Sequence, residues 1–336
     1  MKKSLCILFI LLITTVGVFA GAKNEVSEER LGEVIVYAYD SFTAEWGPGP
    51  ELVKRFEEKT GYKCEMLSIE DIPSRLVLEK DSPVADVVLG IDTNQSSLVF
   101  SQDVLASYKP ENADAIISDD LIMDEDWRLT AYDWGYFAIN YDTKSNIEKP
   151  SSLEDLTNPI YKDKIVLMDP RTSTPGIGFL AWTKAVYGED YIAYWKRLSD
   201  NILSIAPGWT EGYGLYTAGE VPLVLSYTCS PAYHVEYDDT TQYEALIFDE
   251  GHVMQIEGGG LVKNAPNSDG GKAFLDFLIT EEAQEVLPLT QWMYTVNKNV
   301  ELPACYDYAP IANKTLKIDT ANLREAGDLV MEAISK

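Results

Sequence analysis

The fold is decided by the stretch ADVVLGI at residues 85–91, which is apolar at nearly every position in its middle. Strands of this kind are buried on both faces, as in a parallel sheet covered by helices on either side. Upstream, residues 33–39 (EVIVYAY) and 64–69 (CEMLSI) are predicted as two further strands. Between them, residues 51–60 carry apolar side chains on one helical face, and Gly61 is a natural helix end. The order strand, helix, strand predicts a βαβ unit and an α/β fold.

The alternation of strands and helices continues along the chain, without an internal repeat or a flexible linker. We therefore expect two α/β cores, with the chain crossing between them on strands. A cleft between two such cores is a common ligand site. The further strands are expected at residues 136–141, 164–168, 222–227 and 253–256, and the further helices at 176–187, 191–198, 271–279 and 281–287.

The first 22 residues have the pattern of a secretory signal peptide. Lys2 and Lys3 are followed by an apolar run over residues 5–19 and by the small residues AGA at 20–22. A membrane anchor is the alternative, but a spanning helix needs about 20 apolar residues and this run is shorter. We expect residues 1–22 to be cleaved and the mature protein to be soluble and exported to the periplasm.

The chain carries 27 Lys and Arg against 54 Asp and Glu, so its formal charge is 27 − 54 = −27. Such a charge repels phosphate backbones and argues against nucleic acid as a partner. Two His and four Cys are too few for a His-rich or Cys-rich metal site. Without the leader, the cysteines are Cys64, Cys229 and Cys305, so at least one thiol is free. The sequence leaves open which pair, if any, forms a disulfide.

Polar and aromatic clusters follow directly on six of the predicted strands. In open α/β sheets, ligands bind beyond the carboxyl ends of the strands, so these clusters are expected to converge on one cleft. The alternative is that each cluster is an ordinary loop, because turns favour Gly, Pro, Asp and Ser. The clusters are YDSF (39–42) with Trp46, ED (70–71), GID (90–92), DPRTSTPG (169–176), GWTE (208–211) and SYTCSPAYH (226–234).

The aromatic residues of these clusters favour a flat or cationic ligand, and the cluster that ends at Gly176 could bind an anion. Pro175 fits the first turn of a helix that Ser173 or Thr174 caps, and a helix start binds phosphate or carboxylate through its free N–H groups. A plain capped helix is the alternative. An aromatic face over a cation contributes about 0.5–2 kcal/mol, and Asp71 or Asp92 would add negative charge. The aromatic candidates, each of which could instead belong to a core, are Trp46, Trp209, Tyr227, Tyr233 and Trp292.

Taken together, these motifs resemble those of the periplasmic thiamine-binding proteins, which are the substrate-binding components of thiamine ABC transporters. The resemblance covers most of the chain after the leader and fades after Cys305. The matching segments are YDSF (39–42), WGPGP (46–50), ADVVLG (85–90), DWGYF (133–137), DPRTSTPG (169–176), GWTE (208–211), LSYTCSPAYH (225–234), EGH (250–252) and WMY (292–294).

The resemblance implies a type II periplasmic-binding-protein fold, with two α/β lobes and a ligand cleft between them. The first lobe is expected at residues 33–131, completed by about 257–300. The second is expected at 132–256, with 301–336 as a candidate addition. A protein of this kind delivers its ligand to an ABC permease and needs no catalytic residue, metal or cofactor.

The resemblance also implies the ligand and its contacts. The ligand would be thiamine, thiamine monophosphate or thiamine diphosphate, with aromatic rings around its pyrimidine and thiazolium. Asp71 would accept hydrogen bonds, and Ser173 would meet the hydroxyethyl or phosphate end. The ligand-binding positions implied are Tyr39, Trp46, Asp71, Ser173, Trp209, Tyr227, Tyr233 and Trp292.

Two other functions remain possible at this stage. Cys229 stands where the resemblance leads us to expect Thr, which brings a thiol near the cleft, and thiamine-cleaving enzymes with a Cys nucleophile resemble this fold. A nucleophilic Cys needs a base within hydrogen-bond reach, and His234 is the base nearest to it in the sequence. A receptor for another ligand such as ferric ion is the second alternative, although iron receptors of this fold tend to use adjacent tyrosines and no Tyr-Tyr pair occurs here. The segment after Asp71 also looks shorter than the family's loop.

Overall fold

The computed structural model describes residues 32–318, 320 and 322–335. The expected signal peptide at 1–22 lies outside this range. The described residues form one compact unit, and their strands belong to a single connected sheet. The strand order is β2-β1-β3-β10-β5-β8-β6-β7, with β4, β9 and β11 attached beside this path.

The first half of the sheet contains the predicted βαβ unit. Strands β1 (Glu33–Ala38), β2 (Lys63–Ser68) and β3 (Val87–Asp92) are parallel, with β1 in the middle, and helix α2 (Gly49–Thr60) joins β1 to β2. The three strands and the helix predicted from this segment are thereby confirmed. Next to β3 lies β10 (Met254–Val262), which runs antiparallel to it, so the sheet is mixed.

The second half of the sheet is built around β5 (Thr130–Asp142), which is much longer than the strand predicted at 136–141. Strand β8 (Leu223–Tyr227) pairs antiparallel with β5, and β6 (Ile165–Met168) lies parallel between β8 and β7 (Ile202–Ala206). The short strands are β4 (Leu105–Ala106), β9 (Tyr243–Ala245) and β11 (Tyr294–Thr295).

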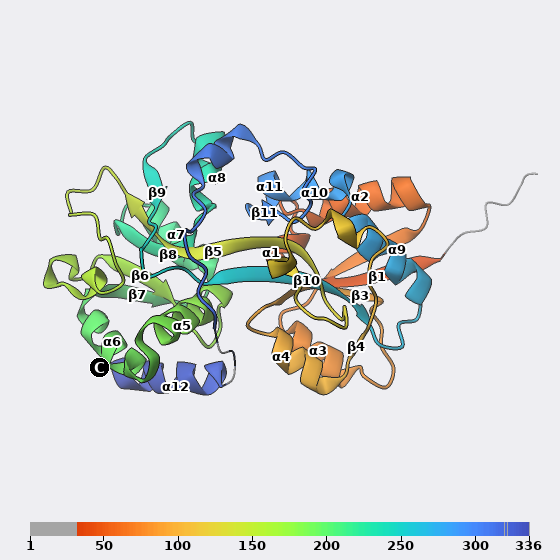
Figure 1. Ribbon diagram of the computed structural model, residues 1–336, viewed down its shortest axis with the longest axis horizontal. Coiled ribbons are helices and arrows are strands. Elements are labelled where there is room, and N and C mark those ends of the chain that lie inside the picture. The colour runs from red at the N-terminus through yellow and green to blue at the C-terminus, as the bar shows by residue number, and fades with distance from the viewer. Residues whose placement is uncertain (1–31, 319, 321, 336) are drawn as a thin grey trace, which may run out of the picture. The chain divides into compact units, whose positions relative to one another are not determined.

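Strands β5 and β10 connect two groups of α/β elements, which we call the first and second lobes (Figure 1). The first lobe comprises β1 to β4 with helices α1 to α4 and α9 to α11, and the second comprises β6 to β9 with α5 to α8 and α12. The remaining helices are α1 (Asp40–Thr43), α3 (Ile72–Leu78), α4 (Ser96–Gln102), α5 (Thr174–Tyr187), α6 (Tyr191–Leu198), α7 (Trp209–Thr217), α8 (Ser230–Tyr237), α9 (Ser268–Leu278), α10 (Glu281–Gln284), α11 (Leu287–Thr290) and α12 (Leu323–Ile334).

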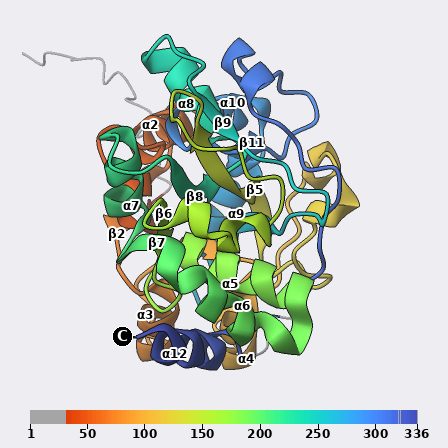
Figure 2. The same ribbon diagram turned by 90° about the vertical axis from the view of Figure 1, so that its left-hand side faces the viewer.

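Each lobe has its own apolar core. In the first lobe, Phe56 of α2 packs against Phe274 and Phe277 of α9, with ring centroids 5.0 and 5.6 Å apart. In the second lobe, α5 is buried along most of its length, and its Phe179 meets Trp195 of α6 at 5.3 Å. Figure 2 shows α5, α6 and α12 together on this side, where α12 packs against the other two helices.

Two predicted elements are wrong in extent, for physical reasons. The strand expected at 253–256 continues to Val262. It includes three consecutive glycines, which in a sequence are typical of the end of a strand. A side chain at Gly259 would lie 2.8 Å from Leu89, so glycine is needed there for close packing. The single helix expected at 281–287 is two short helices, because Pro288 occupies the first turn of α11 instead of ending the preceding helix.

The buried His252 connects strand β5, which runs through both lobes, to a loop of the second lobe. The backbone N–H of Phe248 donates to its Nε2 at 2.8 Å, so its Nδ1 carries the proton and donates to the carbonyl oxygen of Phe137 at 2.8 Å. Its ring lies against Trp182, with centroids 4.6 Å apart. Burial lowers the pKa of His252. Protonation of Nε2 would also remove the acceptor for the backbone N–H of Phe248.

This arrangement predicts a pH dependence of stability. Because the pKa of His252 is lower in the folded state, the unfolded chain binds the extra proton first, and stability falls as pH drops below about 6.5. Replacing His252 with Gln, whose amide oxygen can accept from Phe248, removes this titration. We expect urea unfolding to show a steeper loss between pH 7 and pH 5 in the wild type than in His252→Gln. If the free energy of unfolding falls equally with pH in both proteins, His252 is not the source of this pH dependence.

Candidate functional site

Four of the eight predicted site residues lie at or just beyond carboxyl ends of strands. Tyr39 directly follows β1, Tyr227 is the last residue of β8, Ser173 follows β6, and Trp209 follows β7. These four residues therefore lie where an α/β sheet usually places a ligand. Their partners decide which of these residues act together.

Tyr39 and Tyr227 are joined by a chain of hydrogen bonds through β10. The hydroxyl of Tyr39 donates to Oε2 of Glu257 at 2.7 Å, and that of Tyr227 donates to Oε1 of Gln255 at 2.8 Å. Nε2 of Gln255 in turn donates to Oε1 of Glu257 at 2.8 Å. Because Gln255 and Glu257 are two residues apart on a strand, they share one face of the sheet. The structure thus brings one predicted aromatic residue from each lobe to the same two side chains.

Glu257 receives further donors from neutral groups. The hydroxyl of Tyr132 donates to Oε2 at 2.7 Å, and Nε2 of Gln291 lies 3.5 Å from the same oxygen and also donates to the hydroxyl of Tyr39. Four donors converge on this carboxyl group, which favours its ionised form. Burial raises the pKa of Glu257, and hydrogen bonds from Tyr132, Tyr39 and Gln255 oppose that rise.

Glu257 lies between two other acids in the sheet. Asp92 of β3 and Asp133 of β5 are its direct cross-strand neighbours, and all three are buried. Oδ1 of Asp92 accepts the backbone N–H groups of Asn94 and Gln95 at 2.8 and 2.9 Å, whereas its Oδ2 and both oxygens of Asp133 have no protein partner. Burial and the charge of Glu257 raise the pKa of Asp92 to about 7 and raise that of Asp133 as well.

Tyr233 and Trp292, two of the predicted aromatic residues, form a second group. Their ring centroids are 5.2 Å apart with the planes at 83°, an edge-to-face contact. Tyr237, one helical turn after Tyr233 on α8, packs against the same Trp292 at 5.5 Å. Tyr237 was not predicted, although its spacing from Tyr233 is the usual one for residues on the same helical face.

Trp209 is connected to the Tyr227 segment. Its ring stacks on Tyr213 with centroids 4.7 Å apart and an interplanar angle of 17°. Its Nε1 donates to Oγ of Ser226 at 2.8 Å, and Ser226 in turn shares a hydrogen bond with Ser230. The exposed fraction of Trp209 is 38%, so one part of the ring remains available to a ligand.

Ser173 occupies the N-cap position of α5, but its hydroxyl makes no capping hydrogen bond. The buried Oγ has no protein partner. Pro175 lies in the first turn, as predicted. Arg171 pairs with Asp169 at 2.6 Å. The start of α5 therefore offers a free hydroxyl without a free cation from Arg171.

Like Ser173, two further predicted residues are not brought to the others by any contact. Trp46 is 66% exposed and makes no ring contact with another described aromatic residue. Asp71 is exposed and caps α3, where its Oδ1 accepts the backbone N–H of Ser74 at 3.2 Å. Their part in a ligand site stays a prediction.

Cys229 is fully buried and lies against Met293, with the sulfur atoms 3.8 Å apart. Burial raises the pKa of its thiol. His234 hydrogen-bonds to the hydroxyl of Tyr213 at 2.9 Å and to Asp238 at 2.7 Å, so neither ring nitrogen is directed to Cys229. Cys64, Cys229 and Cys305 are all free thiols.

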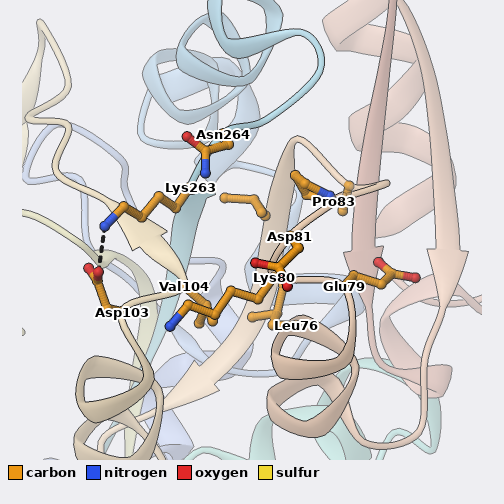
Figure 3. A pocket seen from close by; sticks show the side chains of 11 residues that line it. Leu76, Glu79, Lys80, Asp81, Pro83, Asp103, Val104, Lys263 and Asn264 are labelled. Carbon is orange, nitrogen blue, oxygen red and sulfur yellow. Dashed lines mark hydrogen bonds and ion pairs between the residues drawn. The ribbon is translucent and has the colours of Figure 1, made fainter.

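A small cavity of about 100 Å³ lies elsewhere in the first lobe, beside Lys80, Asp103 and Lys263 (Figure 3). Nζ of Lys263 is paired with Asp103 at 2.5 Å. None of the predicted site residues lines this cavity. Its volume is below the roughly 300 Å³ at which small-molecule pockets begin. We do not assign it a role.

Two further properties concern only the described part of the chain. None of its helices has the length and apolar character that crossing a bilayer requires. None of its groups of His, Cys, Asp or Glu with three or more members is arranged to bind a metal ion.

Gln255 and Glu257 were missed because a polar pair inside an apolar strand gives no hint of its cross-strand partners.

The contribution of the Gln255–Glu257 network to stability can be tested. Replacing Gln255 with Ala leaves the hydroxyl of Tyr227 without its acceptor and Glu257 without one donor, both in a buried place. We expect the free energy of unfolding to fall by about 2–4 kcal/mol in urea titrations.

The matched control for this change is Gln242→Ala. Nε2 of Gln242 donates to Asp142 at 2.8 Å in a half-buried loop, outside the network. Its loss is expected to cost about 1 kcal/mol or less. Equal losses of unfolding free energy in Gln255→Ala and Gln242→Ala would show that the network adds no more to stability than an ordinary hydrogen bond.

Known proteins with the same fold and similar sequence were found. The family of bacterial extracellular solute-binding proteins matches residues 82–315. A thiamine-binding periplasmic protein of Brucella melitensis is 37% identical over 92% of this chain and 93% of its own length. The protein of the same name from Escherichia coli is 35% identical over 86% of this chain and 88% of its own.

Solved structures give the same picture. A periplasmic thiamin binding protein superposes with a TM-score of 0.83 at 34% identity, covering 90% of this chain and 96% of that one. The ferric binding protein from Campylobacter jejuni superposes with a TM-score of 0.75 at 21% identity. At that identity the second likeness supports the fold alone.

Proposed function

This chain belongs to the bacterial extracellular solute-binding proteins, and we propose from this that it captures thiamine outside the cytoplasm and delivers it to an ABC permease. Its fold is the two-lobed type II fold of periplasmic binding proteins, as expected from the sequence. We place the lobe boundaries at 33–131 with 257–300 and at 132–256 with 301–336. We further propose a periplasmic location reached by means of a cleaved signal peptide at 1–22.

The observation that carries this proposal is the meeting of aromatic residues from both lobes at β10. Tyr39 follows a strand of the first lobe and Tyr227 ends a strand of the second, and both hydrogen-bond to neighbouring side chains of one strand. A flat ligand held between such rings gains contacts with both lobes at once. Closure is then favoured because the ligand binds the closed state more tightly than the open one.

The other candidate residues are given roles by the same proposal. Trp209, Tyr233 and Trp292 enclose the pyrimidine and thiazolium rings, which suits their partly exposed faces. Trp46 completes the enclosure, and Asp71 accepts hydrogen bonds from the ligand. Both of these residues are exposed, which leaves their side chains accessible to a bound molecule.

We propose that the start of α5 holds the hydroxyethyl end of thiamine or the phosphate of its monophosphate or diphosphate. The free hydroxyl of Ser173 supports this role, together with the N–H groups and partial positive charge of a helix start. Because Arg171 is already paired with Asp169, the helix itself supplies the positive potential. In this proposal, the hydroxyethyl end of thiamine and the phosphate of its monophosphate or diphosphate bind at the same position, the start of α5.

A receptor is favoured over a thiamine-cleaving enzyme by the state of Cys229. A nucleophilic thiol needs exposure and an adjacent base. The thiol of Cys229 has neither, since it is buried against Met293 and His234 is bonded to Tyr213 and Asp238. The relatives that match over most of the chain are also named as binding proteins.

Calorimetric titration of the mature protein with thiamine, thiamine monophosphate and thiamine diphosphate tests the proposal. We expect saturable binding of at least one form and a change in tryptophan fluorescence. Ferric ion, titrated in parallel, is expected to give no visible charge-transfer band. Flat titrations with all three thiamine forms would refute the ligand assignment.

Trp209 and Trp292 are expected to act as central aromatic anchors. Replacing either with Ala should weaken thiamine binding by about 2 kcal/mol or more in the same titration, because the ring loses its face-to-face contact with the ligand. Tyr308→Ala is the control, since this aromatic residue is 51% exposed and is not among the candidates. Unchanged affinity in both tryptophan variants would eliminate the aromatic enclosure.

The thiol of Cys229 is expected to be dispensable. Incubation of the protein with thiamine should release no free pyrimidine or thiazole at a catalytic rate, as followed by chromatography. Cys229→Thr should keep the thiamine affinity of the wild type within about threefold, because the change is close to isosteric. Catalytic turnover that disappears in this variant would favour the enzyme.

A further inference from the structure

Glu257 is a buried carboxylate whose hydrogen bonds all come from uncharged groups. Its donors are Tyr39, Tyr132, Gln255 and Gln291, and its exposed fraction is 8%. A carboxyl group that only accepts hydrogen bonds is satisfied in its ionised form. The donors therefore hold a negative charge at this point of β10.

This charge has no positive partner among the residues that the structure describes. None of the ion pairs between described residues includes Glu257 or its cross-strand neighbours Asp92 and Asp133. A buried charge without a counter-ion is strongly unfavourable, and buried charges are usually paired. Something that the chain does not supply would relieve this cost.

Unpartnered polar groups surround the same point. Both oxygens of Asp133 and Oδ2 of Asp92 are buried without a protein partner. So are the amide oxygen and nitrogen of Asn94, which is 7% exposed and whose side chain lies against Asp92. None of these neighbours carries a positive charge, so none of them neutralises Glu257.

The position of this charge links it to the proposed ligand. Glu257 binds the hydroxyl of Tyr39 directly and that of Tyr227 through Gln255, so it lies at the hydroxyl ends of the two rings proposed to flank the ligand. A cation between these rings would approach the carboxylate through a medium with little water, where charges interact strongly.

We propose that Glu257 is the counter-charge of a cationic ligand, and that it makes this site select a positively charged heterocycle over a neutral one of the same shape. This inference rests on the proposed function and deepens it. The competing role for Glu257 is purely structural, as the acceptor that orients Tyr39 and Tyr132. The two roles differ in their effect on a ligand without charge.

The experiment compares thiamine with a neutral analogue in which carbon replaces the quaternary nitrogen of the thiazolium ring. Calorimetry measures both ligands on the wild type and on Glu257→Gln. We expect the wild type to bind thiamine about tenfold or more tightly than the analogue, and Glu257→Gln to lose most of that preference. The affinity for the neutral analogue should change by about threefold or less. Equal losses for the two ligands, or a preference that survives in the variant, would overturn the inference.

Two controls separate charge from folding. Glu257→Asp keeps the negative charge on a shorter side chain and should retain the preference for thiamine even where both affinities fall. Glu285→Gln removes the same charge from an exposed surface position and should alter neither affinity. Thermal unfolding of each variant shows whether it is folded.

If Glu257→Gln does not fold, measurements on the wild type and on Glu257→Asp still test whether Glu257 selects a charged ligand. Equal binding of thiamine and the neutral analogue by the wild type would refute charge selection while leaving the proposed function intact. Binding of neither ligand would refute the proposed function, and this inference with it. Preference for thiamine in the wild type and in Glu257→Asp supports the inference.

Discussion

The hydrogen bonds that converge on Glu257 and Gln255 are the constraint on which the site depends. They join the end of β1 in the first lobe to the end of β8 in the second through one strand, β10. Buried acceptors and donors in such a network must stay paired, because each unpaired group is costly. The orientation of Tyr39 and Tyr227, the two rings proposed to flank the ligand, is therefore set by the sheet.

Much of the fold could be predicted from the sequence, because burial on both faces produces the apolar runs that identify β1, β3, β6 and β8. Strand β7 (Ile202–Ala206) was missed because its side chains are mostly half-exposed and its pattern lacks such a run. The length of β10 was missed because three glycines look like a turn, and only the side chains packed above them require glycine. Local sequence does not contain that information.

The site could be predicted in part, for a related reason. Motifs at strand ends led to Tyr39, Tyr227, Trp209 and Tyr233. The structure connects Tyr39 with Tyr227 through Gln255 and Glu257, and it places Tyr233 against Trp292. The part of these residues in ligand binding stays a prediction. Glu257, Asp92 and Asp133 come together only through the register of three strands that are distant in sequence. Register between distant strands is a property of the folded sheet, so the acidic cluster was beyond sequence reasoning.

Strand β5 changes partner in its middle, and this has a mechanical consequence. Its first residues pair with β10 and its last with β8, and at the junction the backbone of Tyr136 and Phe137 bonds to Thr228 and Val253. Because β5 is continuous across this change of partner, a rotation of one lobe against the other would twist β5 without requiring either set of ladder hydrogen bonds to break.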